Sequence, residues 1–108
     1  MAKATRTSDS SSGSEDRHWT DLFATIAALK TPEETQAFLR DLCTRAELDA
    51  MAHRWQVAQL LAEGLPYLEV AQKAQTSTTT VTRVAQWLRN GEGGYRLALA
   101  RRPKAKRT

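Results

Sequence analysis

Five polar side chains recur at helical spacing between residues 78 and 88. They combine threonine hydroxyls and methyls with one guanidinium and one amide, groups that hydrogen-bond to base edges and phosphates or contact the thymine methyl. None of the five is acidic, so none would repel a phosphate backbone. This combination is typical of a helix that enters the major groove of DNA. The five residues are Thr78, Thr79, Thr82, Arg83 and Gln86.

The other face of the same segment is apolar, which predicts an amphipathic helix with one buried stripe. A preceding helix is expected over residues 67–74, and residues 75–77 then form the turn between the two helices. Ser77 can cap the second helix, because its hydroxyl can accept an N–H of the first turn. Residues 67–88 therefore predict a helix-turn-helix. The apolar stripe of the second helix is Val81, Val84, Ala85 and Leu88.

The turn and the second helix each carry an unusual choice of residue. Gln75 stands where many helix-turn-helix motifs use glycine for a positive φ angle, and Thr76 stands where the turn is usually apolar. The second helix is rich in threonine, which has poor intrinsic helicity, whereas a purely structural surface more often carries Glu, Lys or Ala. Contacts with DNA would offset that cost. Two packed helices with no role in DNA binding remain the alternative.

Start and stop signals predict four further helices. The Thr-Pro-Glu-Glu run at residues 31–34 has the types and spacing of a capped helix start, and Thr44 and Glu47 repeat the capping-box pattern. Gly64 is expected to follow the end of the longest helix. Because no run of alternating β-branched residues is found, the chain is predicted to be all-α with six helices. The four additional helices are expected at about residues 15–30, 32–42, 45–63 and 95–102.

Composition suggests how the chain is organised. Residues 1–14 are rich in Ser, Thr, Ala and Gly and are expected to be disordered, residues 15–100 to form one helical domain, and residues 101–108 to be a basic tail. The formal net charge is +4, and six of the 16 Lys and Arg residues lie beyond Glu92, where there is no acid. The tail is either a solvated end or an auxiliary arm that adds salt-sensitive affinity for DNA.

Catalysis, metal binding and membrane insertion are not expected. Cys43, His18 and His53 are scattered along the chain, and no glycine loop has the partners that a phosphate site needs. The apolar runs are too short to span a membrane, and no secretory signal is recognisable. A single cysteine can form no internal disulfide, which fits the reducing cytoplasm.

An ordered series of short segments runs through most of the chain: Phe38–Leu42, Thr44, Glu47, Arg54, Ala58–Gly64, Thr80–Val84 and Gly93–Tyr95. Together they resemble the Trp repressor family, in particular its YerC/YecD-type branch. The resemblance implies an all-helical, intertwined homodimer whose two recognition helices enter successive major grooves of double-stranded DNA. It also implies that aromatic residues form a core shared between the two copies. These are Trp19, Phe23, Phe38 and Trp55.

The resemblance further places three groups of residues against DNA. The recognition helix would approach bases and phosphates, its N-terminal end would bind phosphate through free N–H groups, and the preceding helix would contact the DNA backbone. Glu69 departs from this pattern, because an acid that faces DNA would repel it. In the order given, the three groups are Thr79, Thr80 and Thr82; Ser77 and Thr78; and Gln72 and Lys73.

A small-molecule site is the remaining question that the resemblance raises. The Trp repressor proper binds tryptophan between two arginines, and these match Arg54 and Arg83. Two guanidinium groups can hold a carboxylate and enclose a ring. However, Val84 stands where the pocket needs a small residue, and Trp87 stands where a small polar residue would meet the amino group of the ligand. No cofactor is therefore expected, and L-tryptophan remains the alternative.

These observations predict a sequence-specific DNA-binding transcriptional regulator rather than an enzyme, and the resemblance implies that it represses. Two other functions remain open. One is the DNA-binding subunit of a mobile-element transposase, since small proteins with this motif occur there too. The other is a helical adaptor whose motif binds protein instead of DNA.

Overall fold

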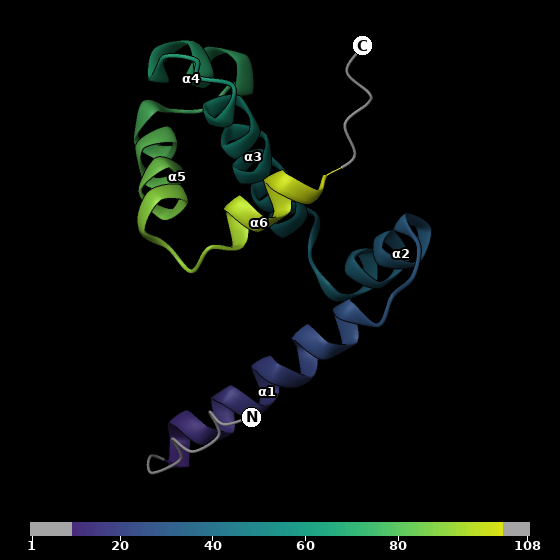
Figure 1. The fold of residues 1–108 in the computed structure, drawn as a ribbon. Helices are drawn as coiled ribbons and strands as arrows, with labels where there is room; N and C mark the ends of the chain where they lie inside the picture. The colour runs from purple at the N-terminus through teal and green to yellow at the C-terminus, as the bar shows by residue number, and fades with distance from the viewer. Residues whose placement is uncertain (1–9, 103–108) are drawn as a thin grey trace. The chain divides into compact units, whose positions relative to one another are not determined.

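The computed structural model describes residues 10–102, and the chain divides into two compact units, residues 1–43 and 44–108. The described residues form six α-helices and no β-strand, so the all-α prediction is confirmed (Figure 1). The boundary between the units follows Cys43, in the short link between the second and third helices. The helices are α1 (Ser10–Ala27), α2 (Pro32–Leu42), α3 (Arg45–Ala62), α4 (Tyr67–Ala74), α5 (Thr78–Asn90) and α6 (Gly94–Arg101).

The two ends of the chain carry predictions that the structure addresses only in part. The segment expected to be disordered lies outside the described residues over positions 1–9. The basic tail lies outside them over positions 103–108. α1 begins at Ser10 rather than near residue 15, so the end of the serine-rich segment is helical. A helix that has already nucleated adds residues at little cost, which explains the longer helix. At its other end, α1 stops at Ala27, before the expected Lys30.

The start of α2 follows its predicted cap closely. Thr31 is the N-cap, its Oγ1 accepts the Glu34 N–H at 3.1 Å, and Pro32 occupies the first turn. The Glu34 carboxylate accepts the N–H of Lys30 at 2.8 Å. A capping box would use the N–H of Thr31 instead, so the return bond of this cap lies one residue earlier than predicted.

The first unit exposes large apolar side chains in the single chain. None of the described side chains of α1 and α2 is fully buried. Trp19 and Phe23 on α1 are 60% and 62% exposed, and Leu42 at the end of α2 is 52% exposed. Phe38 is half-buried. Helices of this kind normally bury one apolar stripe, and here the single chain leaves much of that stripe open to solvent.

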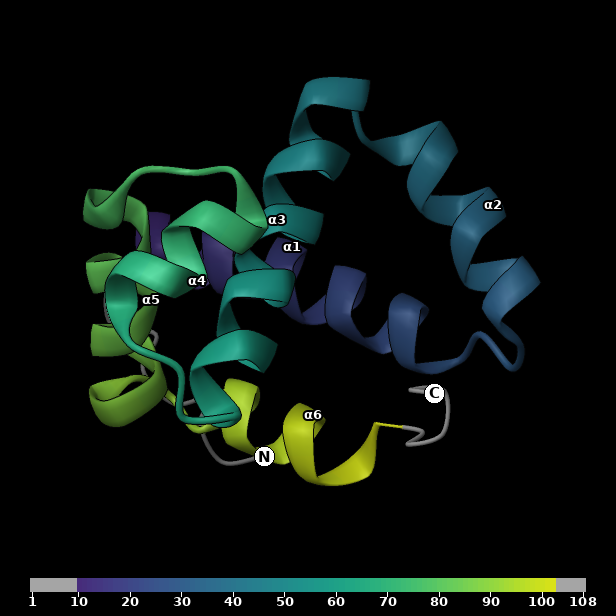
Figure 2. The ribbon, with the colours of Figure 1, turned by 90° about the horizontal axis from the view of Figure 1, so that it is seen from above.

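In the second unit, α3, α4 and α5 pack against one another around a small aliphatic core (Figure 2). Valines fill this core, and alanines between them let the helix backbones approach closely. The predicted apolar stripe of α5 faces inward, with Val81, Val84 and Ala85 buried and Leu88 half-buried. The core cluster consists of Val57, Ala58, Val70, Ala71, Ala74, Val81 and Val84.

Both ends of α3 form as predicted. The Thr44 Oγ1 accepts the Glu47 N–H at 3.0 Å, and the Glu47 carboxylate accepts the Thr44 N–H at 2.8 Å, which completes the capping box. Gly64 follows the last turn with a φ of 87°, a conformation that favours glycine. The chain then turns into Pro66, the N-cap of α4.

The turn between α4 and α5 adopts the geometry that usually calls for glycine. Gln75 has a φ of 55° and a ψ of 54°, in the left-handed region. The Thr76 N–H donates to the Ala71 carbonyl at 3.0 Å, and the Gln75 N–H donates to the Gln72 carbonyl at 3.3 Å. This pair of bonds is the Schellman pattern, which satisfies the last carbonyls of α4. The helix-turn-helix is therefore formed with glutamine in the strained position.

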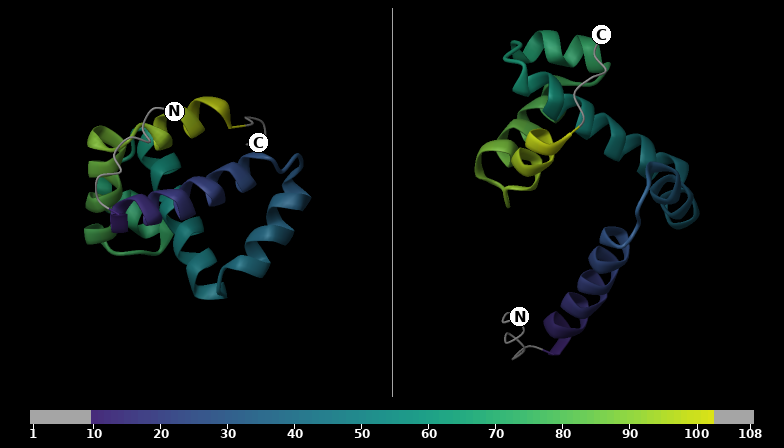
Figure 3. Two further views of the ribbon diagram at one scale, coloured as in Figure 1. Left: turned by 90° about the horizontal axis from the view of Figure 1, so that it is seen from below. Right: turned by 45° about the vertical axis from the view of Figure 1, so that its right-hand side comes forward.

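α6 lies against both α3 and α5 (Figure 3). It follows Gly93, whose φ is 90°, and it spans nearly the residues that the sequence predicted. α5 continues to Asn90, two residues beyond its predicted end at Leu88. None of the helices within residues 10–102 combines the length and apolar character needed to cross a bilayer.

Gly91 ends α5 at a point where a side chain has no room. A Cβ at this position would lie 2.4 Å from the Trp87 carbonyl oxygen and 2.8 Å from the Trp87 ring carbon Cε3. A Cβ at Gly94 would meet no atom within 4 Å. We expect Gly91→Ala to lower the free energy of unfolding by about 1–3 kcal/mol, because the end of α5 must shift to relieve the overlap.

Urea denaturation followed by circular dichroism measures this loss. Gly94→Ala is the matched control, and it should change stability by less than about 1 kcal/mol, in the stabilising direction, because it restricts the unfolded chain. Equal stability of the two variants would contradict the packing described at the end of α5.

Candidate nucleic-acid interface

The structure gathers the five polar residues predicted on α5 at one exposed surface. Each of them is exposed, and together they line a shallow cavity of about 280 Å³. No acidic residue of the described chain lines this cavity. The hydroxyls, the amide and the guanidinium are therefore free to meet hydrogen-bonding groups from outside. The residues are Thr78, Thr79, Thr82, Arg83 and Gln86.

Ser77 caps the N-terminal end of this surface. Its Oγ accepts the Thr80 N–H at 3.1 Å, and the hydroxyl also donates to the Thr80 Oγ1 at 3.3 Å. The first turn of α5 contains no acid. An uncapped N–H and the positive end of the helix dipole are favourable for an anion at this position.

Thr80 is the one threonine of the group that does not belong to the exposed surface. It is half-buried, and it lines a different cavity from the other three threonines. Its position follows from the helical spacing, because residue 80 lies one turn before the buried Val84 on the same side of the helix. The resemblance implies a DNA contact for Thr80. Thr80 would have to make this contact from the edge of the exposed polar surface of α5.

Gln72 and Lys73, on α4, are exposed but do not line the cavity on α5. Both residues lie on α4, the helix before the turn. They could contact the DNA backbone only if the DNA bound at α5 also extended alongside α4. Glu69, the acid that departs from the family pattern, is half-buried on the same helix.

A second and larger cavity, of about 620 Å³, lies between α3, α5 and α6. It brings together Arg54 and Arg83, the two arginines singled out from the sequence. Trp87 lines this cavity and is 58% exposed, so its indole forms a wall instead of filling the space. The full lining is Arg54, Trp55, Thr80, Arg83, Val84, Trp87, Glu92, Gly94, Tyr95 and Ala98.

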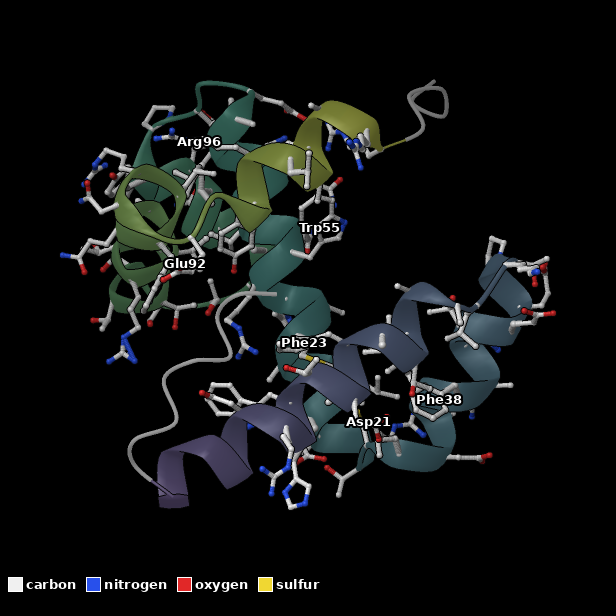
Figure 4. The ribbon with its side chains drawn as sticks, turned by 60° about the horizontal axis from the view of Figure 1, so that its bottom comes forward. Asp21, Phe23, Phe38, Trp55, Glu92 and Arg96 are labelled. Atoms are coloured by element: carbon white, nitrogen blue, oxygen red, sulfur yellow. The ribbon has the colours of Figure 1, made fainter. Side chains whose placement is uncertain are left out.

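The lining includes Glu92 and Tyr95, neither of which was singled out as a site residue from the sequence. Glu92 lies in the loop before α6 and adds a carboxylate to a cavity that already holds two arginines (Figure 4). Tyr95 stacks on Trp55 of α3, with ring centroids 6.4 Å apart and an interplanar angle of 6°. Neither position shows a local pattern that signals a site, because each acquires its neighbours only when α6 packs on α3.

Arg83 belongs to both cavities. Its stem therefore runs between the exposed polar face of α5 and the space beside Arg54. A guanidinium in this position can bind an anion either at the exposed surface of α5 or in the larger cavity between α3, α5 and α6.

Comparison with known proteins agrees with this geometry. A family model described as Trp repressor protein matches residues 17–103. YerC of Bacillus subtilis is 40% identical over 80 residues, which cover 74% of this chain and 77% of that protein. The Trp operon repressor homolog of Actinobacillus succinogenes is 37% identical over 73 residues, which cover 67% of this chain and 72% of that protein. The chain belongs to the Trp repressor family.

Solved structures support the same assignment. The crystal structure of a TrpR-like protein from Eubacterium eligens superposes with a TM-score of 0.74 at 35% identity, and covers 79% of this chain and 88% of that one. A second structure, from Staphylococcus aureus, superposes equally well at 34% identity, with coverages of 79% and 85%. Membership of the Trp repressor family makes this chain one of a family of DNA-binding regulators, not of enzymes.

Proposed function

We propose that this chain is a sequence-specific transcriptional repressor of the cytoplasm, which binds operator DNA as a homodimer through α4 and α5. One observation carries the proposal most directly: the exposed face of α5 combines three threonines, one glutamine and one arginine without an acid. Such a face offers hydrogen bonds and methyl groups to base edges. Val81, Val84 and Ala85 on the opposite side of α5 are buried in the core, so the polar face is turned toward solvent, where a partner can reach it.

The proposed contacts differ along α5. Thr79, Thr82 and Gln86 are proposed to face base edges, and Arg83 to reach either a base or a phosphate. Ser77 and Thr78 lie at the N-terminal end of the helix, where a phosphate would meet free N–H groups. Supporting phosphate contacts would come from Gln72 and Lys73 on α4, and from Thr80 at the edge of the surface.

The proposed dimer rests on the first unit. Its Trp19 and Phe23 leave most of their surface in water, and exposed apolar side chains gathered on one stripe usually mark an interface. A second copy of the chain could cover this stripe. Burial of its exposed apolar surface would then stabilise the dimer by about 25 cal/mol for each Å² removed from water. In a twofold dimer, two copies of α5 would be placed about one turn of DNA apart, so an operator with two related half-sites is expected.

The test of DNA binding is the double variant Thr79→Ala with Arg83→Ala. It removes one hydroxyl and one guanidinium from the exposed surface but leaves the core and the caps unchanged. We expect affinity for an operator to fall at least about tenfold, because a lost arginine contact alone costs about 1–3 kcal/mol. Gel-shift titration measures the affinity.

Arg45→Ala is the charge-matched control, because Arg45 is exposed at the start of α3, away from α4 and α5. Circular dichroism and sedimentation should show unchanged helicity and oligomeric state for both variants. If the double variant bound DNA as well as the wild type, the DNA-binding proposal would be wrong, and a protein-binding adaptor would be favoured.

We further propose that the regulator works without L-tryptophan. Val84 and Trp87 line the cavity between α3, α5 and α6. Both are larger than the small residues that the family pattern uses at these positions, so we expect them to disfavour the amino acid. Titration calorimetry of the wild type with L-tryptophan should show no binding at micromolar concentrations. Trp87→Ser, which replaces the indole by a small polar group, is the variant in which binding should appear.

The opposite result would overturn the tryptophan proposal. Binding of L-tryptophan to the wild type at micromolar affinity, together with tighter binding to operator DNA, would identify the cavity as a working co-repressor site. A separate gel-shift titration of the wild type without the amino acid measures DNA binding, so the two proposals are tested independently.

A further inference from the structure

Arg96 reaches from the first turn of α6 to the end of α5. Its Nε donates to the Leu88 carbonyl oxygen at 3.0 Å, and its Nη2 donates to the Arg89 carbonyl oxygen at 2.9 Å. Carbonyls in the last turn of a helix have no partner within that helix, and they form the negative end of the helix dipole. One guanidinium therefore satisfies two of these groups, at the end of α5 opposite to the Ser77 cap.

The helix that carries Arg96 is itself fixed to the core at two points. Tyr95 stacks on Trp55 of α3, and the Arg102 Nη1 donates to the Gln59 Oε1 at 2.9 Å. Trp55 and Gln59 are four residues apart on α3, so both contacts lie on one side of that helix. Figure 4 shows Arg96 on the side of α6 toward α5, with Trp55 on the other side. α6 is thus held on α3 independently of its contact with α5.

The end of α5 has a further link to the start of the motif. The Arg89 Nη1 donates to the Tyr67 Oη at 3.3 Å, which connects the last turn of α5 with the first turn of α4. The carbonyl of the same Arg89 accepts from Arg96. A chain of hydrogen bonds therefore runs from α4 through the end of α5 to α6, which is fixed on α3.

We propose that Arg96 is a positioning residue for DNA recognition, which sets the direction of α5 relative to α3. The inference rests on the proposed function of α5. Without the guanidinium, α5 would still be held by its turn and its buried stripe, but its far end could shift. Base contacts depend on the placement of the helix in the groove, whereas attraction to phosphates depends mainly on charge. The loss should therefore fall on sequence discrimination.

The test compares Arg96→Gln with Arg101→Gln, which removes the same charge from an exposed position of the same helix. Affinities for an operator and for an unrelated duplex are measured at one salt concentration. Arg96→Gln should reduce the ratio of the two affinities by about tenfold, comparable to one mismatched base pair, and Arg101→Gln should leave it unchanged. Arg96→Lys keeps the charge without the planar fork, so it should also lower the ratio.

Two results would overturn the positioning role. In the first, Arg96→Gln lowers both affinities equally, as Arg101→Gln does, which would make Arg96 a simple phosphate-attracting charge. In the second, Arg96→Lys retains the full ratio, which would show that a positive charge at the helix end is enough.

Hydrogen exchange without DNA separates this inference from the proposed function. In Arg96→Gln, the amides of the last turn of α5 should exchange faster than in Arg101→Gln, while the amides of α3 stay as protected as in the wild type. This outcome would show that Arg96 stabilises the end of α5, even if the wild type recognises no operator. Unchanged exchange at the end of α5, or faster exchange throughout α3 as well, would contradict it.

Discussion

The aliphatic core between α3, α4 and α5 is the constraint on which the rest of the second unit depends. Val57, Val70, Val81 and Val84 are fully or almost fully buried, and the alanines among them allow three helices to meet closely. Because β-branched side chains have few rotamers, such a core fixes the rotation of each helix about its axis. Once the stripe of α5 is turned inward, the threonines, the glutamine and the arginine on its other face have to point outward. The surface available to DNA is thus a consequence of packing.

The two units meet different physical requirements. The second unit buries its own apolar residues, whereas the first leaves Trp19 and Phe23 largely exposed in the single chain. A small domain that cannot bury its apolar surface alone commonly does so by association. In the proposed function the first unit would serve association with a second copy, and α5 of the second unit would serve DNA recognition. Arg83 lines both the exposed polar surface of α5 and the cavity between α3, α5 and α6.

Local signals predicted most of the fold. The capping box of Thr44 and Glu47 is set by neighbours in sequence, and it is present. Gln75, a departure from the glycine usual in this turn, nevertheless adopts a positive φ. The start of α1 was wrong because a serine-rich composition does not show how far a helix propagates. The hydrogen bonds of Arg96 and the place of Glu92 beside two arginines were missed, because both depend on how α6 packs against the other helices. The polar residues of α5 could be found from spacing alone, but the separation of Thr80 from them appeared only in three dimensions.

We propose that α5 reads DNA, in two copies, through an uncharged polar face and one arginine. Selection of bound duplexes from a random pool by the full-length protein tests it most directly. We expect enrichment of a twofold-symmetric site whose half-sites lie about 10 base pairs, one helical turn, apart. Enrichment of a single unpaired half-site would contradict the dimer, and no enrichment at all would contradict sequence-specific recognition by α5.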